Sequence, residues 1–373
     1  MSLKHLHIVA FDVPYPADYG GVIDVFYKIK SLHALGVKIT LHCFEYGRAE
    51  APELLQYCEQ VYYYKRRKYR NPFMGNLPYI VSTRDDETLL ENLCKDNAAI
   101  LFEGLHTTYF IGHSALKERY KLIRNHNIEH EYYKNLEQVE TNYFKKYFFR
   151  NEADHLKQYE AVIALANKVL AISPADHLYL NATYNNSVLI PAFHAQDQAQ
   201  LPSGKGDFIL YHGNLGVGEN NHAALYLAKS VFPKLKMRCV IAGNNPSDEL
   251  KKACEAHPHI ELHNDWSNEA IMQAIQAAQI NVLPTFQGTG VKLKLLNALY
   301  NGRFCVVNPT MVKHTGLEDT CIICEQADDM VIAINQYFTL EFDANAAAQR
   351  LQVLAKSPYN NQVNAQKLLA LLP

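Results

Sequence analysis

The sequence predicts an α/β protein with two parallel sheets, and three observations support this class. Short apolar runs alternate with segments of helical periodicity along both halves of the 373-residue chain. Each half begins with a run typical of a buried strand, at 5–11 and at 208–212. Between the halves, residues 191–207 show little periodicity and are predicted to form a linker. Parallel sheets covered by helices bind ligands at the carboxyl ends of their strands, so we expect two Rossmann-like domains that face each other across a cleft.

The first half is predicted to open with a strand, a Gly-Gly loop, a helix and a second strand. The tight turn of this loop is expected to need positive φ at Gly20 and Gly21. Apolar residues at Val22, Val25, Ile29 and Leu32 have helical spacing, and Gly36 is predicted to end this helix in the left-handed conformation. The predicted strands are 5–11, 37–44, 61–64, 99–103, 120–125, 168–172 and 188–190. The predicted helices are 22–35, 54–59, 86–94, 142–166 and one that starts at Ser173-Pro174, with serine as the cap.

The second half repeats the alternation of strand and helix. Its predicted strands are 208–212, 238–243, 260–263, 280–284 and 304–308. Its predicted helices are 221–232, 248–255, 269–278 and 291–301. The domains predicted from this pattern are residues 1–192 and residues 205–355.

Composition excludes several classes of protein. Lys and Arg number 36 against 38 Asp and Glu, a net charge of −2, which argues against a protein that binds nucleic acid through bulk charge. No apolar run approaches the roughly 18 residues of a membrane span, and the start of the chain lacks the pattern of a secretory signal. Eight cysteines are too few for a disulfide scaffold in a chain of this length, so we expect reduced thiols and a cytoplasmic location.

The most informative segment is 284–302, where a buried strand is followed by a Gly-rich turn and then directly by a helix. Free N–H groups at a helix start, the positive end of the helix dipole, and the neighbouring Lys292 and Lys294 together favour an anion site. Gly288 and Gly290 would let a phosphate approach the backbone. The alternative is a solvated basic helix after an ordinary turn.

Five segments together resemble glycosyltransferases of the group 1, family 4-like type, which have the GT-B fold. The segment 284–302 resembles the family's P-x-x-x-G-x-G-x-K-x-K pattern, and 212–215 resembles the first strand and loop of its donor domain. In the first half, 19–21 resembles the N-terminal glycine loop, 124–129 the R-x-H-N-x-E segment, and 103–106 an acceptor-side strand end. The resemblance covers most of residues 4–310.

The resemblance implies an acceptor domain at 1–192, a donor domain at 205–355, and a segment 356–373 that packs back on the first domain. It also implies roles for single residues. Those expected at the chemistry are His106, Lys292 and Lys294. Those expected at the donor are Gly213, Asn214, Gly288, Thr289, Gly290, Val291 and Asn297. Those expected at the acceptor are Asp18, Gly20, Gly21, Arg124, His126 and Glu129.

The sequence departs from the family pattern on the donor side. Thr289 and Asn297 stand where the family usually has two glutamates, and Asn297 can accept hydrogen bonds from ribose hydroxyls only through a neutral amide. The loop 213–221 lacks the basic residues that usually contact the phosphates, which leaves Lys292 and Lys294 for the diphosphate.

The function implied is transfer of a hexose or related sugar from a UDP- or GDP-sugar, with retention, in bacterial cell-surface polysaccharide synthesis. The acceptor would be a glycan, a lipid-linked sugar or a small molecule. No Asp-x-Asp motif is present, so the sequence requires no metal and no cofactor. The alternatives are a catalytically degenerate member that only binds a nucleotide, and a sugar-nucleotide epimerase that needs no acceptor.

Two metal-like patterns and two surface segments remain. His126–His130 reads H-x-x-E-H and Cys321–Cys324 reads C-x-x-C, but neither has the further ligands that a zinc site needs, so no metal site is predicted. The basic, aromatic segments 62–70 and 143–150 suit either solvated loops or peripheral contact with the inner face of a membrane. Nucleic acid is the least favoured partner for these segments.

Overall fold

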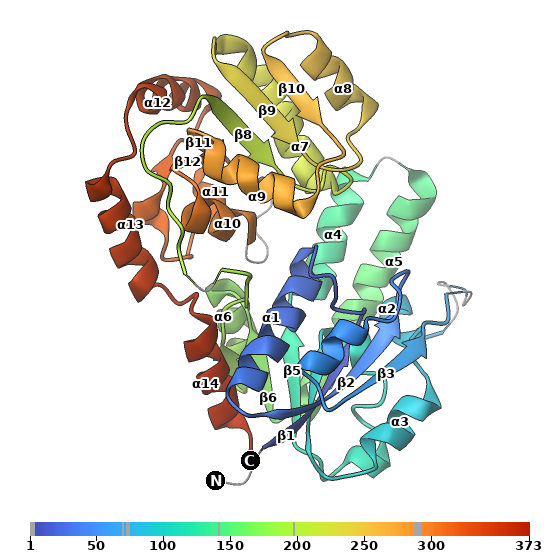
Figure 1. Cartoon of the computed structure of the whole chain (residues 1–373). Coiled ribbons are helices and arrows are strands. Elements are labelled where there is room, and N and C mark those ends of the chain that lie inside the picture. Colours follow the sequence, from blue (N-terminus) through green and yellow to red (C-terminus); the bar gives the residue numbers. More distant parts are fainter. Residues whose placement is uncertain (1–3, 69–70, 72–74, 141, 197, 287–292) are drawn as a thin grey trace. The chain divides into compact units, whose positions relative to one another are not determined.

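The computed structural model describes residues 4–68, 71, 75–140, 142–196, 198–286 and 293–373. The chain forms two compact units (Figure 1), and each is described by itself. The first contains the described residues of Met1–Phe193 and of Tyr359–Pro373. The second contains those of His194–Gly288 and Lys292–Pro358.

The first unit is built on a seven-stranded sheet in the order β3-β2-β1-β4-β5-β6-β7, with every neighbouring pair parallel. Its strands are β1 (His5–Ala10), β2 (Lys38–Glu45), β3 (Gln60–Lys65), β4 (Ala99–Glu103), β5 (Lys121–Asn125), β6 (Lys168–Ala171) and β7 (Ser187–Leu189). Side chains alternate between the two faces of the sheet, so Leu6 and Ile8 of β1 join one core cluster and Val9 joins the other.

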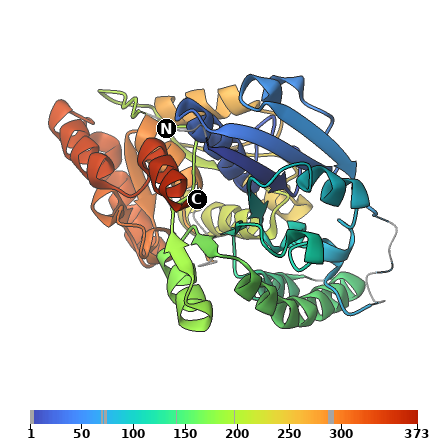
Figure 2. The ribbon, with the colours of Figure 1, turned by 90° about the horizontal axis from the view of Figure 1, so that it is seen from below.

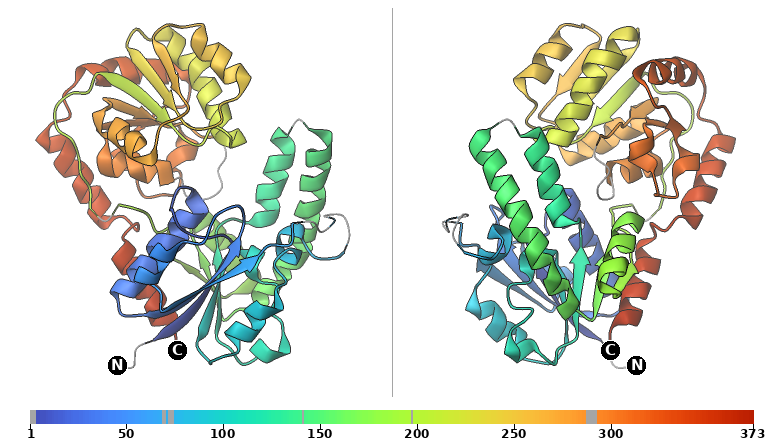
Figure 3. Two further views of the ribbon diagram at one scale, coloured as in Figure 1. Left: turned by 45° about the vertical axis from the view of Figure 1, so that its right-hand side comes forward. Right: turned by 180° about the vertical axis from the view of Figure 1, so that it is seen from behind.

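The helices of the first unit are α1 (Gly20–Ala34), α2 (Tyr79–Ser82), α3 (Glu87–Leu93), α4 (Glu129–Val139), α5 (Tyr143–Tyr159), α6 (Pro174–Tyr184) and α14 (Asn361–Leu371). Gly36 has φ of +80° after α1, as the sequence predicts. The helix predicted at 142–166 ends earlier, because α5 passes into a 3-10 helix at Glu160–Leu165. Helix α4, which the sequence did not predict, runs beside α5 as a two-helix hairpin (Figure 3). Asn142 caps α5 by accepting hydrogen bonds from the N–H groups of Phe144 and Lys145.

The C-terminal helix α14 belongs to the first unit. It packs against α1, and Leu368 lies in the core cluster on that face of the sheet. The Lys4 ammonium donates a hydrogen bond of 2.7 Å to the carbonyl oxygen of Leu372, so the end of the chain lies beside the start of β1. Figure 2 shows this edge of the unit from below.

The second unit contains a six-stranded parallel sheet in the order β10-β9-β8-β11-β12-β13. Its strands are β8 (Phe208–His212), β9 (Arg238–Ala242), β10 (Ile260–His263), β11 (Ile280–Val282), β12 (Phe304–Val307) and β13 (Ile322–Ile323). Its helices are α7 (Gly218–Tyr226), α8 (Asp248–Glu255), α9 (Asn268–Ala277), α10 (Leu293–Asn301), α11 (Pro309–Val312), α12 (Ala327–Thr339) and α13 (Ala344–Lys356). Two parallel sheets with alternating strands and helices confirm the predicted fold class.

Candidate functional site

At the carboxyl edge of the first sheet, a buried network of charges joins α1, β4 and β5. The Lys28 ammonium lies 2.9 Å from an Asp24 oxygen and 2.8 Å from a Glu103 oxygen, and its side chain is fully buried. His126, just after β5, bonds the other Glu103 oxygen through Nε2 at 3.0 Å. Asp24 and Lys28 are four residues apart and therefore lie on the same face of helix α1. That face packs against the end of β4, which carries Glu103.

Arg124 completes this network from β5. Its guanidinium donates to both oxygens of Asp24, at 2.9 and 2.6 Å, and to the carbonyl oxygens of Ile190 and Pro191. Because the side chain has no exposed surface, Arg124 positions Asp24 and the chain after β7. Contact between Arg124 and an acceptor stays a prediction.

The network keeps its carboxylates ionised. Burial by itself raises the pKa of Asp24, but the Arg124 guanidinium and the Lys28 ammonium more than offset it and hold the pKa well below its usual value. For Glu103, burial raises the pKa while Lys28 and His126 lower it, and the pKa is again below its usual value. The cluster is thus neutralised by cations that belong to the chain.

His106 lies beside this network, in the turn after β4. Gly104 opens that turn with φ of +71°, a conformation that favours glycine, and a Cβ there would lie 2.8 Å from His106 Nδ1. The rings of His106 and His126 each lie 5.4 Å from the ring of Phe11. Burial and the charge of Arg84 hold the pKa of His106 well below its usual value, so its imidazole is neutral at neutral pH.

Glu129 lies apart from the network, at the start of α4. Burial, together with the charges of Asp176 and Glu152, raises the pKa of Glu129 to about 8. Burial likewise raises the pKa of Asp176 to about 6. Glu152 uses its carboxylate to accept hydrogen bonds of 2.8 and 2.9 Å from the N–H groups of Tyr79 and Ile80, at the start of α2.

The glycine loop differs from its prediction. Gly20 and Gly21 were expected to need positive φ in a tight turn, but both form the first turn of α1, and neither has positive φ. Gly21 is required for another reason, since a Cβ there would lie 2.6 Å from Phe11 Cζ, whereas a Cβ on Gly20 would meet nothing within 4 Å. Asp18, before the helix, pairs with Arg48 at 2.7 Å.

In the second unit, Lys294 reaches the carboxyl end of β8 from the first turn of α10. Its ammonium donates to Asn220 Oδ1 at 2.8 Å and contacts the hydroxyl of the buried Tyr211 at 3.4 Å. Asn220 in turn donates from Nδ2 to the carbonyl oxygen of Asn214 at 3.0 Å. Burial, followed by the charge of Lys294, lowers the pKa of His212 to about 3, so this imidazole is also neutral.

Gly213 and Asn214 form the loop between β8 and α7. A Cβ on Gly213 would lie 3.2 Å from the side chain of Asn220, and a Cβ on Gly243, after β9, would lie 1.7 Å from the Gly213 carbonyl oxygen. Two loops that follow neighbouring strands therefore meet backbone to backbone, and only glycine fits at the contact. The structure thus brings Lys294, Gly213 and Asn214 together around Asn220.

The remaining donor-side predictions are only partly covered by the structure. Asn297 is half-buried on α10, and its carbonyl oxygen accepts a hydrogen bond of 3.0 Å from Asn301. The predicted residues Gly288, Thr289, Gly290, Val291 and Lys292 lie outside the described residues.

Comparison with known proteins identifies the second unit. Residues 206–339 match the family of Glycosyl transferases group 1. The chain has the GT-B fold, and residues 206–339 of its second unit are similar to the domain of group 1 glycosyltransferases. A protein of Klebsiella pneumoniae described as an uncharacterized 44.6 kDa protein in the cps region is 29% identical over 329 residues, which are 83% of this chain and 84% of that protein.

Two solved structures show the same fold at low identity. TarM matches with a TM-score of 0.71 and 13% identity, over 99% of both chains. A trehalose-6-phosphate synthase, studied for glycosyl transfer with retention, matches with a TM-score of 0.67 and 10% identity, over 98% of both chains. The resemblance to GT-B glycosyltransferases of group 1 that the sequence predicts is therefore confirmed.

Within the first unit, the zinc-protease pattern at 126–130 is split between two partners. His126 bonds Glu103, whereas His130 bonds Glu160 at 2.9 Å through Nδ1. The two cysteines of the C-x-x-C pattern flank β13, and both are free thiols. Neither arrangement gathers the ligands of a zinc site among the described residues.

The two segments considered for membrane contact differ in the exposure of their aromatic rings, since Tyr62 and Tyr63 are half-buried and Tyr64 is buried. At the start of α5, Tyr143 is 79% exposed and Phe144 is 82% exposed. In the other segment, the Arg66 guanidinium lies 4.4 Å from the ring centre of Tyr46. No helix among the described residues has the length and apolar character to cross a bilayer. Peripheral contact of this chain with a membrane stays a prediction.

Sequence reasoning missed four residues that organise these sites: Asp24 and Lys28 in the first unit, and Tyr211 and Asn220 in the second. A signal existed for the first pair, because an aspartate and a lysine four apart lie directly next to Val25 and Ile29 on the buried face of a helix. For Tyr211 the signal was weaker, since an aromatic residue in an apolar strand is ordinary core material.

Proposed function

We propose that this chain transfers a sugar from a UDP- or GDP-sugar to a glycan or lipid-linked acceptor during synthesis of a cell-surface polysaccharide, with retention at the anomeric carbon. The observation that carries the proposal is the arrangement of Lys294, Asn220 and Asn214 at the carboxyl end of β8. The cps-region relative supports the choice of pathway, and the retaining trehalose-6-phosphate synthase supports the stereochemistry.

In the proposed reaction, the bond between the anomeric carbon and the diphosphate breaks, and its electron pair stays on the diphosphate. The acceptor hydroxyl oxygen bonds to the same carbon, and its proton passes to an oxygen of the departing diphosphate. Negative charge therefore grows on the leaving group, and a lysine held at a helix start stabilises it. Lys294 has this position on α10, and its bonds to Asn220 and Tyr211 fix the ammonium before the donor binds.

The first unit is proposed to hold the acceptor near Gly20, Gly21, His106 and His126. His106 is neutral because burial lowers its pKa, so its imidazole can bond a sugar hydroxyl as either donor or acceptor. The network of Asp24, Lys28, Glu103 and Arg124 keeps His126 in place.

Calorimetric titration with UDP and GDP tests the proposal. We expect one of them to bind the wild type, and Lys294→Ala to bind it at least 10-fold more weakly, because a hydrogen bond to a charged group contributes about 1.5–3 kcal/mol. Turnover of the matching donor should fall about 10²–10³-fold. Lys252→Ala, an exposed lysine on α8, is the matched control and should behave as wild type. Equal binding by wild type and Lys294→Ala would reject the proposed donor site.

Titration together with the turnover assay separates the two alternatives. Nucleotide binding that depends on Lys294, without consumption of any UDP- or GDP-sugar, would indicate a binding protein, for which Asn297 in place of a carboxylate is the supporting feature. Consumption of the sugar nucleotide with no acceptor, and with an epimeric sugar nucleotide as the product, would indicate an epimerase.

A further inference from the structure

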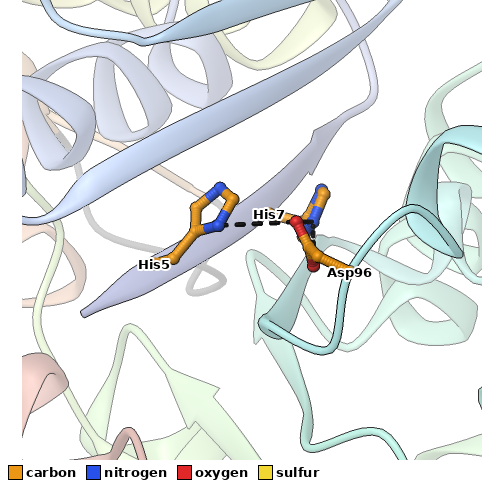
Figure 4. Close-up of side chains that lie close together, drawn as sticks. All are labelled: His5, His7 and Asp96. Atoms are coloured by element: carbon orange, nitrogen blue, oxygen red, sulfur yellow. Dashed lines mark hydrogen bonds and ion pairs between the residues drawn. The ribbon is translucent and has the colours of Figure 1, made fainter. Parts of the chain in front are cut away.

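A second cluster of histidine and carboxylate lies at the amino edge of the first sheet (Figure 4). His5 and His7 belong to β1, and because they are two residues apart their side chains leave the strand on the same face. Asp96 comes from the turn between α3 and β4. One ligand atom of each residue lies within 4.8 Å of the others.

The spacing of these atoms suits a small divalent cation. His7 Nε2 lies 3.1 Å from Asp96 Oδ2, and His5 Nδ1 lies 3.4 Å from the same oxygen. Ligand atoms about 2.0–2.1 Å from a tetrahedral zinc ion are roughly 3.3 Å apart. Small shifts of three side chains would therefore place all three atoms on one ion.

The side chains are already oriented by a second layer of polar groups. His5 Nε2 bonds Thr40 Oγ1 at 2.9 Å, and His7 Nδ1 bonds His42 Nε2 at 2.9 Å. Asp96 Oδ1 accepts the N–H of Ala98 at 2.8 Å. Metal-ligating histidines characteristically have the other ring nitrogen held in this way, because that contact fixes the ring for the ion.

The cluster also has access to solvent. It borders a surface pocket of about 410 Å³ that is lined by Lys4, His5, Asp96 and Leu372 among others. The side chains of His5 and Asp96 are 30% and 36% exposed, whereas that of His7 is 2% exposed. An ion can enter from the pocket, and water can fill its fourth position.

Charge distinguishes this cluster from the one at the carboxyl edge. The structure also groups Asp24, Glu103 and His126 closely enough for a metal ion. There, however, the Lys28 ammonium lies 2.9 and 2.8 Å from the two carboxylates and takes the place of a metal ion. At the amino edge, the neighbouring cation is Arg119, whose Nη2 lies 3.5 Å from Asp96 Oδ1 and whose other donors bind the carbonyl oxygens of Leu93, Asp96 and Ala98.

We propose that His5, His7 and Asp96 bind one Zn²⁺ ion. Two imidazoles and one carboxylate are ligands that zinc favours, and the set is completed by water. The ion would connect β1 to the turn before β4. This site lies at the opposite end of the strands from the proposed transferase chemistry, so its role is to hold the fold together.

Titration of EDTA-treated, tag-free full-length protein with zinc chloride tests this proposal. We expect one equivalent to bind the wild type and to raise its Tm, and both effects to be lost or weakened at least 10-fold in His5→Gln and Asp96→Asn. The two substitutions avoid the buried His7, so that folding is preserved, which circular dichroism checks. His257→Gln is the matched control, because His257 and His259 are also two residues apart but have no carboxylate grouped with them among the described residues.

The result that overturns the proposal is equally specific. Wild type that binds no zinc, or His5→Gln and Asp96→Asn variants that bind it as wild type does, would exclude this site. Loss of the bound equivalent in His257→Gln would assign it to other histidines. Sugar transfer plays no part in the readout, so failure of the proposed function and failure of the zinc site are distinguishable.

Discussion

The two edges of the first sheet contain the same kinds of side chain but balance their charge differently. At the carboxyl edge, Lys28 lies between Asp24 and Glu103, so the chain itself supplies the cation. At the amino edge, Asp96 is 36% exposed and pairs with Arg119 at 3.5 Å, and a further cation can reach His5, His7 and Asp96 from the pocket beside them. Full burial against a lysine therefore separates the structural network from the solvent-accessible candidate binding site.

Removing the internal cation is expected to have the largest effect on stability. Lys28→Met keeps the length of the side chain but leaves Asp24 and Glu103 with one positive partner fewer in a fully buried position. Because an uncompensated buried charge is costly, we expect the free energy of unfolding to fall by about 3–5 kcal/mol. Urea denaturation followed by circular dichroism measures the change.

The neighbouring Lys30→Met on α1 is the control, since Lys30 is exposed and its ammonium lies over the ring of Tyr27. Its unfolding free energy should change by less than about 1 kcal/mol. If Lys28→Met were as stable as Lys30→Met, the network would not depend on the lysine, and the contrast between the two edges would be lost.

The sequence predicted the fold better than the site for a physical reason. Periodicity and glycine positions are local, so the alternation of strands and helices and the left-handed Gly36 could be predicted. Partners such as Arg124 and Asp24 are 100 residues apart and meet only through the order of the strands. The prediction of positive φ at Gly20 and Gly21 was wrong. The glycine at 21 is explained by the packing of Phe11 against it, and no local sequence pattern reveals that contact.

Glu129 differs from the carboxylates at both edges, because the charges that act on this buried acid are other carboxylates, those of Asp176 and Glu152. Its pKa rises from 4.5 in the unfolded chain to about 8 in the folded one. Between these values the folded chain keeps a proton that the unfolded chain has released, so the free energy of unfolding falls as the pH rises. Each pKa unit corresponds to about 1.36 kcal/mol, and we expect the free energy of unfolding to fall by roughly 3–4 kcal/mol between pH 5 and pH 8 from this group.

Glu129→Gln isolates this effect, because the amide has no proton to lose. The stability of the variant relative to wild type should increase from pH 5 to pH 8, and chemical denaturation at both values measures it. Glu131→Gln, an exposed residue two positions further along α4, serves as the control and should leave the pH dependence unchanged. A pH dependence that Glu129→Gln shares with wild type would show that Glu129 titrates normally.

The smallest effect distinguishes the two glycines that open α1 at the carboxyl edge. Gly20→Ala adds a methyl group to open space in a helix, and we expect it to raise the free energy of unfolding by up to about 1 kcal/mol. Gly21→Ala places a methyl group 2.6 Å from Phe11 Cζ, so the ring must move, at a cost of about 1–3 kcal/mol. Denaturation of the two variants in parallel measures the difference, and equal stability would show that Phe11 moves without cost.

Turnover of the sugar donor by the same pair then tests whether a ligand uses the open space at Gly20. A Gly20→Ala protein that is as stable as wild type but slow in transfer would indicate that the acceptor approaches the backbone there, because nothing in the folded chain contacts the added methyl group. Loss of transfer in Gly21→Ala alone would instead indicate that the added methyl group displaces Phe11, whose ring contacts both His106 and His126. Full activity in both variants would remove the two glycines from the acceptor site.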